Sequence, residues 1–159
     1  MRFVAATLAV LTLAALAAGC GSGSYTKRDF VARADAICAS TLQQTRAISP
    51  PSFSHSAEQQ LSALAGYLAN VLPHVQSEAD QLRALRRPTQ DARDRAALAR
   101  YLGALARAIV DYRELAAAAK RGDAQGVASA ETALRSSPVA SLAASYGLDS
   151  CAAPGTIAV

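Results

Sequence analysis

The sequence predicts an all-α protein, an up-and-down antiparallel bundle of four helices whose last helix is broken near Ser137-Pro138 and which is stapled by one disulfide. The 159-residue chain is 52% hydrophobic but only 5% aromatic, with six Pro and nine Gly. Such a composition favours helices over sheets. Apolar residues also recur at spacings of three and four along successive segments separated by Pro or Gly, which is typical of amphipathic helices joined by short connections. The length fits one domain.

The first helix is expected to begin at Thr26, because a hydroxyl N-cap followed three residues later by Asp29 forms a capping box. Arg33 and Asp35 should face away from the core. Two adjacent prolines in Ser49-Pro50-Pro51-Ser52 end the helix. The inward positions are Phe30, Ala34, Ile37, Cys38, Thr41 and Thr45.

A second helix, opened by Ser54 or Ser56, has the most regular apolar stripe. Pro73 lies off the stripe, so we expect a kink near Ala69 to Pro73 and not a break. Glu78 interrupts the stripe. We expect Pro73 to shift the register so that Glu78 reaches solvent or pairs with an arginine; the alternative is a buried acid with a raised pKa, which is a mark of functional sites. The stripe consists of Leu61, Leu64, Leu68, Val71, Val75, Leu82 and Leu85.

A third helix should follow Arg86-Arg87-Pro88, with Thr89 or Asp91 as its N-cap. It should run to about Arg121, where Gly122 supplies a C-terminal cap. Its inward residues are Leu98, Tyr101, Leu102, Leu105, Ile109, Tyr112, Leu115 and Ala119.

The fourth helix is predicted to be short and weak. Asp123 caps it, and Gly126 costs about 1 kcal/mol relative to Ala. Ser137-Pro138 restarts the helix, with Ser at the N-cap and Pro at the first helical position, and Gly147 ends it. The inward residues of the two parts are Val127, Ala130 and Leu134, then Val139, Leu142 and Tyr146.

The amino terminus predicts export. Arg2 precedes an uncharged, mostly apolar run from Phe3 to Ala18. This run is shorter than a membrane-spanning helix, which needs about 20 residues. At its end, Leu16-Ala17-Ala18-Gly19-Cys20 resembles the bacterial lipobox, in which the cysteine is lipidated on sulfur and becomes the mature N-terminus. Residues 1–19 are then a lipoprotein signal peptide and residues 20–25 a lipidated flexible tether. The alternatives are an ordinary signal peptide with Cys20 as a spare thiol, and an uncleaved anchor.

The two remaining cysteines predict a disulfide. Cys38 and Cys151 form an even pair in an exported protein, where thiols are oxidised by default. The alternative is a reactive or metal-binding thiol pair, which needs close spacing such as CxxC or nearby histidines. The bundle domain should therefore span residues 26–151, and residues 152–159 should form a loose tail.

Three stretches of the mature chain carry a resemblance. They are the helix from Thr26 to Ile37-Cys38, the segment Leu82-Arg83-Ala84-Leu85 leading to Pro88, and the end Tyr146-Gly147-Leu148-Asp149-Ser150-Cys151. With the lipobox, they are similar to a group of small actinobacterial lipoproteins and secreted proteins. The resemblance implies an exported helical domain with a disulfide between its two cysteine motifs. It carries over no catalytic or ligand-binding residue.

Residues that could support chemistry are few. His55 and His74 have no acid or cysteine at ligand spacing, so we expect no metal site and no cofactor. A G-x-S-x-G turn and a glycine-rich phosphate loop are both absent from the sequence. We therefore expect a protein that is not an enzyme.

The arginines offer one candidate binding face. Arg93, Arg100 and Arg107 repeat every seven residues and share one side of the third helix, where they could meet anionic lipid headgroups or wall polymers. However, oppositely charged residues spaced four positions apart are equally typical of an ordinary solvated helix face. The third helix has two such pairs, Asp91/Arg95 and Arg107/Asp111. Nucleic acid is not expected as a partner.

The sequence thus predicts an envelope lipoprotein anchored to the outer face of the cell membrane. Its helical domain would be a non-enzymatic interaction or structural module that recognises another envelope protein or an anionic polymer. The alternative is a lipoprotein that binds a small apolar or lipid ligand within the bundle, with Tyr67, Tyr101 and Tyr112 lining the cavity.

Overall fold

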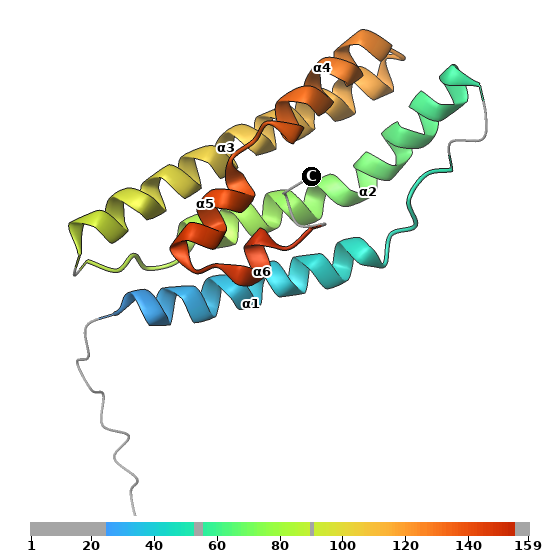
Figure 1. Cartoon of the computed structure of the whole chain (residues 1–159). Helices are drawn as coiled ribbons and strands as arrows, with labels where there is room; N and C mark the ends of the chain where they lie inside the picture. The colour runs from blue at the N-terminus through green and yellow to red at the C-terminus, as the bar shows by residue number, and fades with distance from the viewer. Residues whose placement is uncertain (1–24, 53–55, 90, 155–159) are drawn as a thin grey trace, which may run out of the picture.

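The computed structural model describes residues 25–52, 56–89 and 91–154, and the regular elements in these ranges are all helices, with no strand (Figure 1). The all-α prediction is confirmed. Helices α1, α2 and α3 run antiparallel to their neighbours, α4 folds back along α3, and α5 and α6 return the chain to α1. The helices are α1 (Lys27–Arg46), α2 (Ala57–Ala84), α3 (Ala92–Lys120), α4 (Ala124–Arg135), α5 (Val139–Tyr146) and α6 (Asp149–Ala152).

Side-chain caps fix the starts of the three longest helices. Thr26 forms a capping box with Asp29 at the start of α1, and Ser56 forms one with Gln59 at the start of α2. The hydrogen bonds from Thr26 lower the pKa of Asp29. Asp91 accepts two backbone N–H bonds at the start of α3. These short-range signals set the boundaries as the sequence predicts.

Helix α2 continues through Pro73 without a break. In Figure 1 its axis changes direction along its length, as a proline within a helix requires. Pro73 is exposed, whereas Val71 and Val75 on either side are buried. The helix therefore keeps one continuous buried stripe on both sides of the proline.

The end of the chain differs from the sequence prediction in two details. The N-cap of α5 is Pro138, without a side-chain cap bond, and the prediction of Ser137 is wrong. The backbone N–H of Ser137 instead donates to the carbonyl of Leu134, so Ser137 completes the last turn of α4. The short helix α6 was not predicted, and it includes Ala152, which was assigned to the tail. Residues 155–159 lie outside the described residues.

Two glycines occupy positions that need a left-handed backbone. Gly122 follows α3 with φ of 69°, and Gly147 follows α5 with φ of 93°. Both were predicted as C-terminal caps, and both are confirmed. The turn at Gly147 brings Leu148 into the core, where it is fully buried.

Gly126 in α4 should resist the substitution that usually stabilises helices. Glycine to alanine in a helix normally gains about 0.5 to 1 kcal/mol. At Gly126, however, a Cβ would overlap the carboxylate of Asp123 and would lie 3.0 Å from the Cβ of Ala118. The Asp123 carboxylate would have to rotate and lose the hydrogen bond that it accepts from the Gly126 N–H at 2.8 Å. Losing a cap costs about 1 kcal/mol.

We therefore expect Gly126→Ala to leave the free energy of unfolding unchanged or lower, measured by urea denaturation. Gly66 in α2 is the matched control, because a Cβ there meets no atom within 4 Å. Gly66→Ala should gain about 0.5 to 1 kcal/mol. Equal gains from both substitutions would contradict the packing at Gly126.

Candidate functional site

Among the described residues, the core contains one acidic side chain, Glu78 of α2, which is only 1% exposed. The prediction that Glu78 reaches solvent or pairs with an arginine is wrong. Because α2 keeps its register through Pro73, position 78 stays on the stripe between Val75 and Leu82, both of which are buried. The alternative, a buried acid, is what the structure shows.

Three helices surround the Glu78 carboxyl group. Thr41 of α1 makes a side-chain hydrogen bond to it. Tyr101 and Tyr112 of α3 interact with it electrostatically. One carboxyl oxygen, Oε2, is buried and has no hydrogen-bond partner within the described part of the chain. Hydrogen bonds within the protein therefore replace only part of those that the Glu78 carboxyl group would make to water.

Burial raises the pKa of Glu78 to about 7, and the hydrogen bond with Thr41 opposes this shift. Burial likewise raises the pKa of Tyr112 to about 12, with smaller contributions from Tyr67 and Glu78. The pKa of Tyr101 is also raised by burial and by Glu78. Glu78 can therefore take up or release a proton near neutral pH, while the tyrosines around it stay protonated.

Of the three tyrosines of the sequence analysis, Tyr101 and Tyr112 interact with this carboxyl group, whereas Tyr67 interacts with Tyr112. Tyr101 is buried, and Tyr67 and Tyr112 are half-buried. A cavity between them was the expectation of the ligand-binding alternative. Three hollows lie beside α3, against α4, the connection between α4 and α5, or the start of α2. They have volumes of about 330 to 380 Å³, and none of the three tyrosines lines them.

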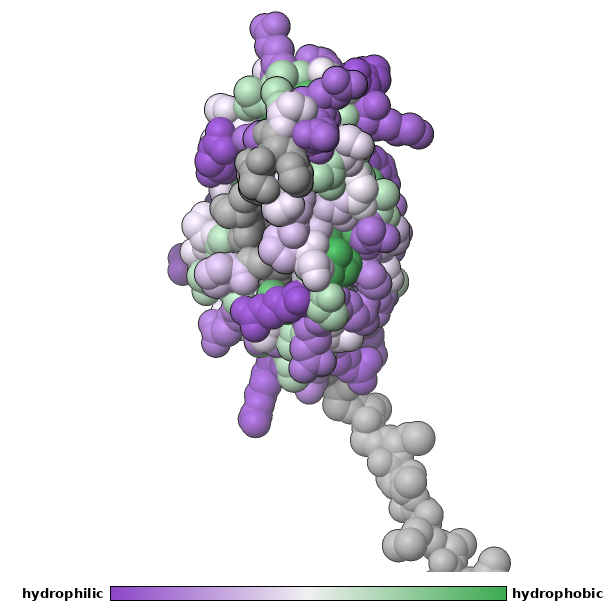
Figure 2. Space-filling view, turned by 90° about the vertical axis from the view of Figure 1, so that its right-hand side faces the viewer, coloured by the Kyte–Doolittle hydropathy of each residue, from purple (hydrophilic) through white to green (hydrophobic). Residues whose placement is uncertain are grey.

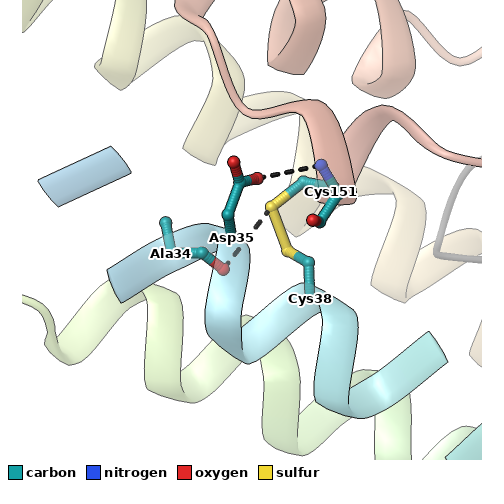
Figure 3. The surroundings of a disulfide bond; sticks show 5 residues. Ala34, Asp35, Cys38 and Cys151 are labelled. Carbon is teal, nitrogen blue, oxygen red and sulfur yellow. Dashed lines mark hydrogen bonds between the residues drawn. A yellow bond between two sulfur atoms is a disulfide. The ribbon is translucent and has the colours of Figure 1, made fainter. Parts of the chain in front are cut away.

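The predicted disulfide joins Cys38 of α1 to Cys151 of α6, with their Cα atoms 5.0 Å apart (Figure 3). A carboxylate oxygen of Asp35 accepts a hydrogen bond from the backbone N–H of Ser150 at 2.9 Å. The sulfur of Cys151 lies 3.8 Å from the carbonyl oxygen of Ala34. The prediction that Asp35 faces away is therefore wrong, since its carboxylate helps to hold α6 against α1.

The sequence could not have revealed the role of Asp35. Its position in α1 falls between the inward residues Ala34 and Cys38, and its partner lies 115 residues further along the chain. Only the disulfide, by placing α6 beside α1, brings the Ser150 N–H within reach. Glu78 did carry a signal, because it interrupts an otherwise apolar stripe.

Arg93, Arg100 and Arg107 are exposed on α3, and none of them forms an ion pair within the described residues. The pairs Asp91/Arg95 and Arg107/Asp111 are likewise not formed there. Asp91 instead caps the start of α3. The three arginines remain a candidate face for an anionic partner.

One large apolar side chain, Val110, is notably exposed on the described surface, at 48%. It lines a hollow between α3 and the start of α5, together with Arg107 and Pro138.

Figure 2 shows the end of the molecule where α2 begins and α3 turns into α4, with hydrophilic side chains projecting around the rim and paler residues between them.

The other candidate residues give no site. Cys20 and His55 lie outside the described residues. His74 is partly exposed, and its Nδ1 lies 2.7 Å from the amide oxygen of Gln44. Within the described residues, no group of three or more His, Cys, Asp or Glu could hold a metal ion. None of the described helices has the run of apolar residues that crossing a bilayer needs.

Comparisons with protein-family models, with curated proteins and with solved structures find no match to this chain.

Proposed function

We propose that the protein is an exported lipoprotein, held at the outer face of the cell membrane by acyl chains on Cys20, whose helical domain is a non-enzymatic module that binds another component of the envelope. The observation that carries the proposal is the disulfide between Cys38 and Cys151. Disulfides persist in oxidising compartments and are rare in the cytosol, so this bond supports export.

The cysteine inventory supports the anchor. The chain contains three cysteines, and the disulfide uses two. The third, Cys20, ends the apolar run from Phe3 to Ala18 in the Leu-Ala-Ala-Gly-Cys pattern. Two or three acyl chains give stable membrane attachment, whereas one chain alone is marginal.

The described surface supports a binding role for the domain. Arg93, Arg100 and Arg107 form no ion pairs in the described structure, and Val110 is exposed beside Arg107. A partner with negative charge and a small apolar contact would match these side chains.

Metabolic labelling with palmitate tests the anchor. We expect the wild-type protein, expressed in a bacterial host, to incorporate label that resists extraction with organic solvent. Cys20→Ala should abolish the label, because the acylated sulfur is removed. The double variant Cys38→Ala/Cys151→Ala is the matched control and should keep the label. Unlabelled wild-type protein, or label retained in Cys20→Ala, would contradict the proposal.

A further inference from the structure

One end of the bundle is built from the start of α1, the end of α2 and the start of α3 (Figure 1). Side-chain contacts hold these three elements together at this end. The guanidinium groups of Arg33 and Arg86 each lie 5.6 Å from the ring centroid of Tyr25, and the ammonium group of Lys27 lies 2.9 Å from Asp94. Tyr25 is the first described residue, so the chain from Cys20 enters the domain at this end.

Positive charge is concentrated at this end. Its two segments, residues 25–33 and 80–95, together contain eight Lys or Arg and four Asp or Glu. We call them the basic end. The segments at the opposite end, residues 46–58 and 113–125, contain four Lys or Arg and three Asp or Glu. The basic end thus has an excess of four positive charges, equal to the formal net charge of +4 of the whole chain.

The four carboxylates of the basic end are already engaged. Asp29 and Asp91 accept backbone N–H bonds at the starts of α1 and α3. Asp80 pairs with Arg83, and Asp94 pairs with Lys27. The remaining cations form no ion pair with a carboxylate within the described residues. They are Arg28, Arg33, Arg86, Arg87, Arg93 and Arg95.

The tether sets how far this end can lie from the membrane. Four residues lie between Cys20 and Tyr25, so the fully extended chain from Cys20 to Tyr25 spans at most about 18 Å. The Debye length at physiological ionic strength is about 8 Å, so only charges close to the surface are attracted to it. The basic end is the part of the domain that the tether holds nearest to the membrane and lets come within that range.

We propose that the basic end is a docking surface for anionic lipid headgroups of the membrane in which Cys20 is anchored. This inference rests on the proposed function. The docked domain stands with its helices pointing away from the membrane. Because α3 has 29 residues, the turn between α3 and α4 then projects about 40 Å outward.

This orientation competes with one in which the domain lies flat on Arg93, Arg100 and Arg107. Arg107 lies 14 residues beyond Arg93, or about 21 Å along the axis of α3. The upright domain therefore keeps Arg107 out of electrostatic reach of the lipid, and the flat one brings it close. The two orientations give different distances from the membrane for probes placed at the two ends of the bundle.

The test uses the protein purified from host membranes and reconstituted in vesicles. A fluorophore is attached through Thr89→Cys at the basic end or through Gln125→Cys at the opposite end; both native residues are exposed. The vesicles carry nitroxide-labelled headgroups and contain phosphatidylcholine alone or mixed equally with phosphatidylglycerol. In the mixed vesicles, we expect the probe at position 89 to be quenched at least twofold more strongly than the probe at position 125. Added salt should remove this difference.

Charge reversal provides the matched comparison. Arg28→Glu/Arg87→Glu should abolish the preferential quenching, whereas Arg113→Glu/Lys120→Glu makes the same change in charge at the opposite end and should leave it intact. All four native side chains are exposed. Equal quenching at both ends, or the same quenching without phosphatidylglycerol, would overturn the inference.

The same preparation tests the lipid anchor and the docking surface independently. The intact mass shows whether acyl chains are present, and their absence would count against the proposed function alone. In that case, co-sedimentation with vesicles containing phosphatidylglycerol still tests the basic end. Arg28→Glu/Arg87→Glu should weaken this binding at least about tenfold. Undiminished binding would overturn the docking surface.

Discussion

Raising the pH from 5 to 8 should lower the free energy of unfolding by about 2 to 3 kcal/mol, because Glu78 is forced to ionise inside the core. The pKa of Glu78 is about 7 in the folded protein, against an ordinary value of 4.5. Between these values the folded state holds a proton that the unfolded state has released. Each pH unit in this range therefore costs about 1.4 kcal/mol. The stabilisation is complete below the unfolded pKa and lost as the pH rises through the folded one.

Glu78→Gln should remove this dependence. The amide has the shape of the protonated acid and stays neutral, so the variant should be about 2 to 3 kcal/mol more stable than the wild type at pH 8. Glu114→Gln is the matched control, since Glu114 is exposed on α3, and it should keep the wild-type slope. Urea denaturation at several pH values measures the effect. A wild-type slope that persists in Glu78→Gln would show that another group is responsible.

Removing the disulfide should cost about 4 to 5 kcal/mol. The bond joins residues 113 positions apart, and closing a loop of that length removes much of the entropy of the unfolded chain. Domains of this size are stable by only about 5 to 15 kcal/mol in total. Urea denaturation of Cys38→Ala/Cys151→Ala should therefore show a protein close to the limit of folding at 25 °C.

Two further variants separate the covalent bond from its surroundings. Asp35→Ala removes the hydrogen bond to the Ser150 N–H but keeps the disulfide, and it should cost about 1 to 2 kcal/mol. Cys20→Ala removes a cysteine outside the described domain and should leave the unfolding transition unchanged. A loss below about 1 kcal/mol for the double cysteine variant would contradict the role of the bond in joining α6 to α1.

Local signals in the sequence predict most of the fold. The capping residues Thr26, Ser56, Asp91 and Asp123 each act within three residues, so their effect is visible without any tertiary contact. The same is true of Gly147, whose left-handed conformation ends α5. Helix α6 has four residues and no side-chain cap, and it is held by contacts with α1. A segment of that kind has no local signal to predict it.

The candidate site was harder to predict because its parts come from different helices. The exposure of Glu78 depends on whether Pro73 shifts the helical register, and the sequence allows either outcome. The contacts of Glu78 with Thr41 and Tyr101 depend on how α1, α2 and α3 pack. The concentration of positive charge is visible only once Arg28 and Arg87, far apart in the chain, are placed at the same end of the bundle.

The most direct test of the proposed function is the intact mass of the protein recovered from host membranes, alkylated without reduction. We expect a chain that begins at Cys20, carries two or three acyl chains and has no alkylated cysteine at positions 38 and 151. A chain that retains residues 1–19, or a mature chain without acyl groups, would contradict the anchor, and alkylation at Cys38 would contradict the disulfide.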